Sequence, residues 1–391
     1  MLDKHALGLC ASIVLVVTAC GGSKSSGSGQ AGGAGTTSSG TGNGSTSTTS
    51  GTGASGTSSS GTTSSSGSAT CAGPGYTVTG SIFTAQEPWN TPVDTAPLDP
   101  TSDTMIQWLA ANGGWGAGNH LQIDTSLILL CGDATTPMMP YVSAGCGPDC
   151  DSAHTTFPVP NGGSIEADLG YACTSGGDCH LLVVDVSRNL LWEMFGAFSP
   201  PGAFNSVGGP ILWDLTHAYG PSLRGEGCSS ADAAGYPIGA MLFTADEVKA
   251  GSIDHAVRFA LPNDRIRDGD LFFQPATHTG VTSSPGKPTR PDAPPYGVRF
   301  RLKSSFDVST LVPGAQVIAK ALKKYGMLLA DGGNIPLMAA DDSFTKTKWT
   351  DVGLDTHALF GIQVTDFEVL QLGSMQTIGD SCMPGTGYRV P

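Results

Sequence analysis

The sequence predicts a mainly β protein, built as an antiparallel β-sandwich or jelly roll with a few peripheral helices. Strand-like apolar runs dominate residues 71–391, and turn-forming Gly, Pro, Ser and Thr separate them. Helical patterns are sparse, so the chain lacks the helical crossovers that a parallel sheet usually needs. The predicted strands are residues 121–131, 180–186, 190–195, 211–215, 255–261, 271–274, 297–303, 327–330 and 366–372.

The clearest local element is a hairpin predicted from residues 180–186 and 190–195, two apolar runs joined by a short polar loop. Because side chains alternate across a strand, the length of the loop decides which residues share a face. An even-length loop would place Glu193 on the face of His180, and an odd-length loop would place it on the face of Asp185.

Three helices are predicted. Residues 103–111 carry apolar side chains on one face. Residues 244–247 form a capping box that begins a short helix ending near Gly251. Residues 315–325 combine an apolar face with a lysine-rich end, and Gly326 stops that helix.

The first twenty residues predict a lipoprotein signal peptide. Lys4 precedes an apolar run that is too short to span a bilayer, and the run closes on Val-Thr-Ala-Cys at Cys20. This motif resembles the bacterial lipobox, in which the Cys receives the lipid, so we expect Cys20 to be the lipidation site and a membrane anchor. An ordinary cleaved signal peptide is the alternative. Gly21 is not Asp, so the resemblance does not specify the inner membrane, and we expect an outer-membrane or cell-surface location.

Residues 21–70 are expected to form a disordered linker of Gly, Ser and Thr that joins the anchor to a single β-rich domain at 71–391. The linker has no aromatic or large aliphatic residue, so it cannot bury enough apolar surface to offset its ordering entropy. A flexible chain of this length reaches about 40 Å on average. A glycosylated stalk is the alternative for so Ser- and Thr-rich a segment.

Composition limits the partners and the compartment. The formal net charge of −14 excludes nucleic acid and anionic membrane surfaces as favourable partners. Beyond Cys20 there are eight cysteines, which predict up to four disulfides in an oxidising compartment, with 105 possible connectivities. They are Cys71, Cys131, Cys146, Cys150, Cys173, Cys179, Cys228 and Cys382.

Three disulfides are suggested by position. Cys146 with Cys150 and Cys173 with Cys179 enclose turn residues and would close local loops, whereas a pairing of Cys71 with Cys382 would clip the two ends of the domain together. A zinc site at Cys146 and Cys150 is the rival interpretation. No second close pair of Cys or His follows at finger-like spacing, which favours disulfides.

The strand at 190–195 holds the first candidate catalytic residue. Glu193 stands beside Trp192 in an otherwise apolar run. A carboxylate there either points to solvent or lies in a cleft with a raised pKa, and a neighbouring aromatic suits a sugar ring. With Asp214, Glu193 would form the acid and base pair of a glycosidase.

Histidine and arginine supply further candidates. His180, which precedes an apolar strand, and His255 would carry acid–base chemistry in a lyase, with Arg258 as a binding residue. His278 follows another strand, and the three histidines would form a metal site only if they converged. Isolated histidines on apolar faces are more often structural.

A glycine-rich polar loop at 223–235 is typical of a functional loop. Its Arg224 and Asp232 would either bind a ligand or pair with each other and fix the loop. No Gly-x-Ser-x-Gly elbow, His-Glu-x-x-His pattern or phosphate loop occurs in residues 71–391, so no cofactor and no resident metal are expected.

Several segments together resemble a family of exported bacterial proteins of unknown function, and the resemblance covers most of residues 71–391. It implies export but carries no catalytic role. The segments are Pro-Trp-Asn at 88–90, Gly-Asp-Cys-His at 177–180, Ser-Ala-Asp-Ala-Ala-Gly at 230–235, His-Ala-Val-Arg-Phe at 255–259, Pro-Ala-Thr-His at 275–278, Gly-Val-Arg-Phe-Arg-Leu-Lys at 297–303 and Ala-Leu-Lys-Lys-Tyr-Gly-Met at 321–327.

These observations favour a surface-anchored protein whose extracytoplasmic domain degrades a polysaccharide, as a glycosidase or a lyase. A non-catalytic module that binds a glycan or a protein is the first alternative, and it needs a groove without perturbed titratable groups. A metal-dependent hydrolase is the second.

Overall fold

The computed structural model describes residues 70–77, 80–143, 146–199, 204–206, 208–280, 289–378 and 382–391. Contacts between residues divide the chain into Met1–Ser64 and Ser65–Pro391, and all described residues belong to the second unit. The predicted signal peptide, Cys20 and nearly all of the linker lie outside the described residues.

The largest sheet has six strands of mixed direction, in the order β1-β13-β9-β12-β11-β14. Its centre is parallel, because β9 pairs with β12 in the same direction, and β1 pairs with β13 likewise. The strands are β1 (Ile123–Leu127), β9 (Val257–Leu261), β11 (Arg299–Leu302), β12 (Met327–Gly332), β13 (Leu337–Ala340) and β14 (Phe367–Val369).

A second sheet of four strands has the order β2-β5-β6-β8. The strands are β2 (Leu129–Gly132), β5 (Leu181–Asp185), β6 (Leu190–Phe195) and β8 (Gly208–Asp214). β5 and β6 form the predicted hairpin, and Leu182 pairs with Glu193 across it. The loop between them has an even number of residues, so Glu193 shares the face of Leu182, as the even-length alternative requires.

Two smaller sheets and several helices complete the unit. The order β4-β3-β7 joins Thr156–Pro158, Met138–Ser143 and Phe204–Ser206, and β10 (Leu271–Phe273) pairs with β15 (Met375–Thr377). The α-helices are α1 (Ser102–Ala111), α2 (Gly116–Asn119), α3 (Ala245–Ala250) and α4 (Pro313–Lys324). Short 3-10 helices lie at Gly147–Asp149, Gly239–Met241, Asn263–Arg265, Val308–Thr310, Trp349–Val352, Val364–Asp366 and Pro384–Thr386.

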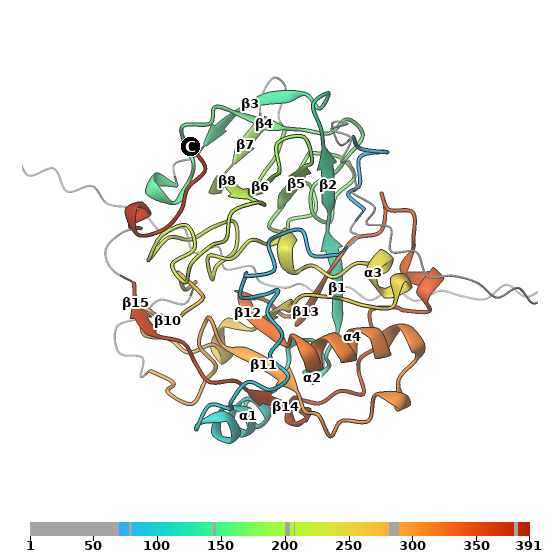
Figure 1. The fold of residues 1–391 in the computed structure, drawn as a ribbon, viewed down its shortest axis with the longest axis vertical. Coiled ribbons are helices and arrows are strands. Elements are labelled where there is room, and N and C mark those ends of the chain that lie inside the picture. The colour runs from blue at the N-terminus through green and yellow to red at the C-terminus, as the bar shows by residue number, and fades with distance from the viewer. Residues whose placement is uncertain are drawn as a thin grey trace, which may run out of the picture. The chain divides into compact units, whose positions relative to one another are not determined.

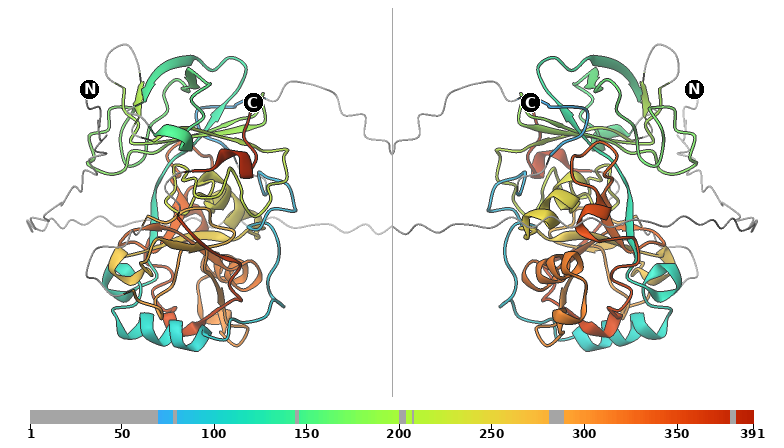
Figure 2. Two further views of the ribbon diagram at one scale, coloured as in Figure 1. Left: turned by 90° about the vertical axis from the view of Figure 1, so that its left-hand side faces the viewer. Right: turned by 90° about the vertical axis from the view of Figure 1, so that its right-hand side faces the viewer.

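The four-stranded sheet separates two hydrophobic cores. Leu182, Leu191 and Trp213 belong to the larger core, which continues into the six-stranded sheet. Val183 and Trp192, on the opposite face, belong to a smaller core beneath β3, β4 and β7. Figure 1 shows β3 to β8 above and β11 to β14 below, with β1 leading directly up into β2, and Figure 2 shows the green segments above the orange ones from both sides. The contact between the two large sheets is therefore where distant parts of the sequence meet.

The three predicted helices are confirmed. In α3, the Thr244 hydroxyl accepts a hydrogen bond from Glu247 N–H, and the Glu247 carboxylate accepts from Thr244 N–H, which completes the capping box. Gly251 ends this helix with φ of 92°, a left-handed conformation that favours glycine. α4 buries Ile318 and Leu322 and ends in two lysines.

A mainly β architecture with few helices is confirmed, but the predicted antiparallel arrangement is not what the structure shows. The pairs β1–β13, β9–β12, β2–β5 and β3–β7 are parallel. Parallel strands that follow each other closely in the sequence need helical crossovers. Here the parallel neighbours are far apart in the chain, and other strands lie between them in the sequence and return the chain to the same direction.

Four disulfides join the eight cysteines of the described residues, and they indicate an oxidising, extracytoplasmic environment. The two local pairs, Cys146–Cys150 and Cys173–Cys179, are as expected, which leaves no free thiols for a zinc site at Cys146 and Cys150. The pairing of Cys71 with Cys382 is wrong. Cys71 bonds Cys131 because Gly75 bridges to Leu130, and Cys382 bonds Cys228 because Met383 bridges to Glu226.

Among the described residues, no helix combines the length and the apolar character that crossing a membrane requires.

We expect loss of the Cys228–Cys382 disulfide to cost far more stability than loss of Cys173–Cys179. The first bond spans 154 residues and the second spans 6, and the chain entropy removed from the unfolded state grows with loop length. A double Ser substitution at Cys228 and Cys382 should lower the free energy of unfolding by about 2–5 kcal/mol. Urea denaturation of the two double variants measures this, and equal losses would contradict it.

Candidate active site

A cleft lies where the four-stranded and six-stranded sheets meet, and both sheets contribute to its walls. The first hollow of this cleft encloses about 290 Å³. Glu166, Asp178 and His180 reach it from the segment that leads into β5. Arg258 on β9 and Asp331 on β12 reach it from the six-stranded sheet.

A second hollow of about 360 Å³ shares Asp178 and Asp331 with the first. Its walls also include Asp232 and the half-buried ring of Phe195. The Phe195 ring lies 5.5 Å from the His180 ring, so an aromatic surface adjoins the charged groups. Asp178 and Asp331 thus occupy the junction of two hollows, which gives a bound chain room on both sides of them.

Irregularities of the strands cluster at this cleft. The strand pairs of the described residues show three register shifts, between Asp124 and Leu127, between Glu193 and Phe195, and between Leu329 and Asp331. Each of these shifts adjoins a residue that lines one of the hollows. A bulge re-aims side chains and is over-represented beside active sites. The bulge before Asp331 turns that carboxylate out of the ladder and into the cleft.

His180 and Glu166 form a buried ion pair. Nδ1 of His180 lies 2.6 Å from a Glu166 carboxylate oxygen, and Nε2 lies 3.1 Å from the carbonyl oxygen of Ala231. A carbonyl oxygen only accepts, so Nε2 carries a proton. Burial lowers the pKa of His180, but Glu166 outweighs burial and raises the pKa to about 9. The ring is therefore an imidazolium at neutral pH.

The backbone on both sides of this pair is strained. Cys179, just before His180, has φ of 53°, and Ala167, just after Glu166, has φ of 57°. These are left-handed conformations that cost a non-glycine residue about 1 kcal/mol or more, and such strain concentrates at functional sites. The Cys173–Cys179 disulfide holds the first of them.

Arg258 binds two carboxylates from different elements. Its Nη2 lies 2.5 Å from an Asp232 oxygen and 3.6 Å from an Asp331 oxygen. Arg258 and Asp232 are each 1% exposed, whereas the Asp331 side chain is 22% exposed and reaches the cleft. Burial raises the pKa of Asp232 to about 7, against the opposing charge of Arg258. Burial also raises the pKa of Asp331, against Arg258 and His180.

The loop that carries Asp232 is fastened to the strand that carries Asp331. The N–H of Ala234 donates both to the Asp232 carboxylate, at 2.8 Å, and to the carbonyl oxygen of Ala330 in the bulge, at 3.0 Å. Gly235 has φ of 83°, and a Cβ there would lie 2.1 Å from the hydroxyl oxygen of Thr277. Only glycine fits this turn, so the loop has a single close-packed path.

Glu193 lies behind the cleft, fully buried in the larger core. The indole N–H of Trp213 and the backbone N–H of Gly239 each donate to its carboxylate at 3.0 Å. Burial raises its pKa to about 7, and the charges of Arg258 and His180 oppose that rise. Glu193 therefore belongs to the same network of charges, but it lines neither hollow of the cleft. It is neither the solvent-exposed residue nor the cleft residue of the sequence alternatives.

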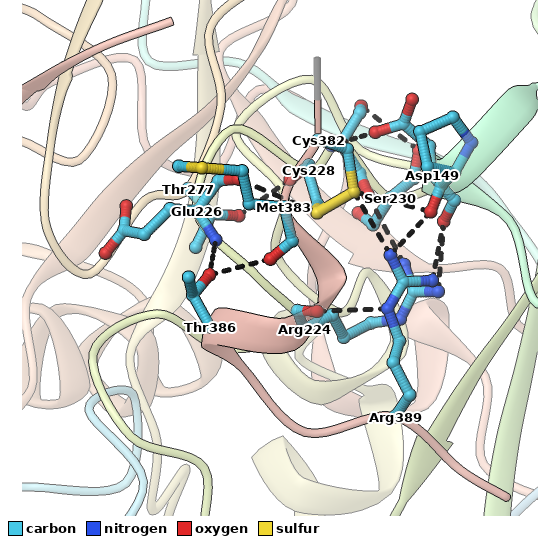
Figure 3. The surroundings of a disulfide bond; sticks show 12 residues. Asp149, Arg224, Glu226, Cys228, Ser230, Thr277, Cys382, Met383, Thr386 and Arg389 are labelled. Carbon is cyan, nitrogen blue, oxygen red and sulfur yellow. Dashed lines mark hydrogen bonds between the residues drawn. A yellow bond between two sulfur atoms is a disulfide. The ribbon is translucent and has the colours of Figure 1, made fainter. Parts of the chain in front are cut away.

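The C-terminal segment is fastened to the 223–235 loop, whose residues 229–233 line the second hollow. The Cys228–Cys382 disulfide joins this segment to the 223–235 loop, and Arg389 donates to the Cys382 sulfur at 3.3 Å (Figure 3). Arg224 and Arg389 both pair with Asp151, at 2.6 and 3.0 Å. Arg224 is thus structural and does not pair with Asp232, contrary to the expectation that the two would pin the loop together.

Two other sequence candidates lie away from the cleft. Trp192 is 3% exposed and packs edge-on against Phe157 and His154 in the smaller core, so it offers no surface to a sugar. Asp214 follows Trp213 on β8 and lies near the C-terminal segment, because its carboxylate accepts from the hydroxyl of Tyr388 at 3.0 Å. Asp214 and Glu193 are therefore not brought together.

The three histidines have separate environments. His255 is buried beside Glu247, with Nε2 at 3.2 Å from its carboxylate, and His278 hydrogen-bonds the carbonyl oxygen of Ala233. Within the described part of the chain, only Asp149, Cys228 and Cys382 bring three metal-ligating atoms together, and both cysteines are in a disulfide. The histidines do not assemble a metal site there.

The structure brings four of the residues singled out in the sequence into one network, namely Asp232, His180, Arg258 and Glu193. The sequence left open which candidates would converge. Sequence reasoning missed Asp331, Asp178, Glu166 and Phe195. A signal for Asp331 was present, because it ends an apolar strand and precedes Gly332 and Gly333. Glu166 had none, because it lies in an irregular segment with no periodic pattern.

Comparisons of the chain with protein-family models, with curated proteins and with solved structures found no match. The resemblance to exported bacterial proteins therefore stays a prediction from the residues.

We expect the His180–Glu166 ion pair to make the free energy of unfolding fall as the pH becomes alkaline. The folded pKa of His180, about 9, exceeds its unfolded value of 6.5. Its stabilising contribution is therefore complete below pH 6.5 and is lost as the pH rises through about 9. The difference corresponds to about 3 kcal/mol at most. Urea midpoints measured across this range should fall less in a His180→Gln variant than in the wild type, and parallel declines would refute the ion pair.

Proposed function

We propose that this protein is an extracytoplasmic enzyme that hydrolyses a polysaccharide at the junction of the two hollows. The observation that carries the proposal is Asp331, a carboxyl group with a raised pKa that shares both hollows with the exposed carboxylate of Asp178. A perturbed carboxyl in a cleft is typical of an acid–base catalyst, whereas a simple binding groove needs none. The two hollows offer space for sugar units on both sides.

In the proposed reaction, Asp331 donates its proton to the glycosidic oxygen as the bond from that oxygen to the anomeric carbon breaks. Asp178 takes a proton from a water molecule whose oxygen bonds to the same carbon. One water is consumed, and exchange with solvent restores the two carboxyl groups. Two carboxyl groups in these roles are the usual machinery of glycoside hydrolysis. Asp232 and Arg258 act as positioning residues that hold Asp331.

The charges of the cleft favour hydrolysis over β-elimination. A polysaccharide lyase needs a cation to neutralise the carboxylate of its uronic acid substrate. The two cations on the wall of the first hollow, His180 and Arg258, are each paired with carboxylates of the protein. Neither is free to neutralise a substrate carboxylate.

We expect Asp331→Asn and Asp178→Asn each to lower kcat by about 10²–10⁴-fold, the usual contribution of a general acid or base. Release of reducing ends from a panel of polysaccharides measures this. Because Asp331 keeps its proton to higher pH than an ordinary Asp, the alkaline limb of kcat/KM should lie above the ordinary carboxyl value of 3.8.

Asp103→Asn is the matched control, since Asp103 is an exposed carboxylate on α1, which packs against β14 at the opposite edge of the six-stranded sheet from β1. Full activity of Asp331→Asn, or loss of activity only in Asp214→Asn, would move the site away from this cleft. Loss of activity on addition of a chelator would indicate a metal-dependent hydrolase instead.

We also propose that a lipid on Cys20 anchors this domain to the outer membrane or cell surface, with residues 21–70 as the tether. The lipobox-like motif that ends at Cys20 supports the anchor, and the disulfides support the compartment. An anchored enzyme with a flexible tether suits a polymeric substrate outside the cell.

We expect Cys20→Ser to shift the full-length protein from the membrane fraction to the soluble fraction, because the lipid would have no thiol to attach to. Immunoblots of fractionated cells measure this, with Cys10→Ser as the matched control. Equal membrane association of the two variants would exclude Cys20 as the anchor.

A further inference from the structure

The cleft carries more negative than positive charge. The first hollow is lined by four carboxyl groups, from Asp124, Glu166, Asp178 and Asp331, and by two cations, from His180 and Arg258. The second hollow adds Asp149 and Asp232, and none of the described residues that line it is basic. The excess of carboxyl groups therefore extends to both sides of Asp331.

The two cations of the cleft are neutralised within the fold. His180 pairs with Glu166 at 2.6 Å, and Arg258 pairs with Asp232 at 2.5 Å. Among the residues that the structure describes, no Lys, Arg or His forms an ion pair with Asp124 or Asp178. The Asp124 carboxylate accepts a hydrogen bond from the backbone N–H of Ser126, and neither carboxylate has a cation among the described residues as its partner.

A buried donor on the same wall also lacks an acceptor. Arg258 is 1% exposed, and its Nε has no hydrogen-bond partner within the described ranges. A buried donor without an acceptor is costly. A sugar hydroxyl in this hollow could supply an uncharged acceptor. The wall therefore favours a ligand that has hydroxyl groups as well as positive charge.

We propose that the polymer bound and cut here is an amino sugar chain with free, protonated amines. The assignment of the polymer rests on the hydrolysis proposed above. Amines would face Asp124 and Asp178, and hydroxyl groups would lie along the wall that Arg258 lines. Uronic acid polymers are excluded because their carboxylates would face unpaired carboxylates of the protein, and an acetylated amine would leave Asp124 and Asp178 without a cation.

The test compares two oligomers of glucosamine of equal length, one with free amines and one fully N-acetylated, on the wild-type full chain. Calorimetry should show at least tenfold tighter binding of the free-amine oligomer at low salt, and the gap should shrink in high salt because salt screens exposed charges. Asp124→Asn should raise the Kd and KM for the free-amine oligomer several-fold without a matching loss in kcat. Asp103→Asn, with the same change in charge, should leave both affinities as in the wild type.

Equal or tighter binding of the acetylated oligomer, or of an oligomer of galacturonic acid, would overturn the amino sugar assignment. Oligolysine that competes as well as the free-amine oligomer would overturn it too, in favour of a basic peptide. Reducing ends measured in the same samples separate the two proposals. Selective binding without cleavage leaves the ligand assignment standing and refutes hydrolysis, whereas cleavage without amine selectivity refutes only the amino sugar.

Discussion

The rest of the cleft depends on the ion pairs of the buried Arg258 guanidinium. Arg258 stands on β9, near the centre of the six-stranded sheet, and binds Asp232 from a loop and Asp331 from β12. Removing one partner of a buried ion pair leaves an uncompensated charge and costs about 3–5 kcal/mol. The same ion pairs hold Asp331 at the junction of the two hollows, where burial raises the pKa of its carboxyl group. Arg258 therefore contributes both to the stability of the fold and to the proposed chemistry.

Around Arg258 the fold contains bulges and disulfides that a regular sheet does not need. Bulges in β1, β6 and β12 turn side chains toward the cleft, and disulfides fix the irregular segments that regular pairing leaves loose. These bulges and disulfides gather around the cleft, where acidic side chains outnumber basic ones. An oxidising location outside the cytoplasm makes the disulfides durable, and it limits the ligands to those that an exported protein meets.

Much of the local structure could be predicted from the sequence, because hairpins, capping boxes and terminal glycines are local signals. The positions of β5, β6 and α3 follow from them. The burial of Trp192 could not be predicted, because it packs against Phe157 on β4, a three-residue strand with no clear pattern. The parallel pairing of β9 with β12 is a long-range event that no local pattern encodes. The proximity of Asp331 to His180 could not be predicted for the same reason, although the sequence does show Asp-Gly-Gly after an apolar strand.

Titration of the Asp331 and Asp232 carboxyl carbons by NMR, in the full chain, tests most directly whether the Arg258 cluster holds a proton in the cleft. We expect the Asp331 signal to titrate above the ordinary value of 3.8, and the Asp232 signal to titrate at about 7, because burial opposes their ionisation. Both carboxyls titrating at or below 3.8 would contradict the account, since Asp331 would then carry no proton to donate.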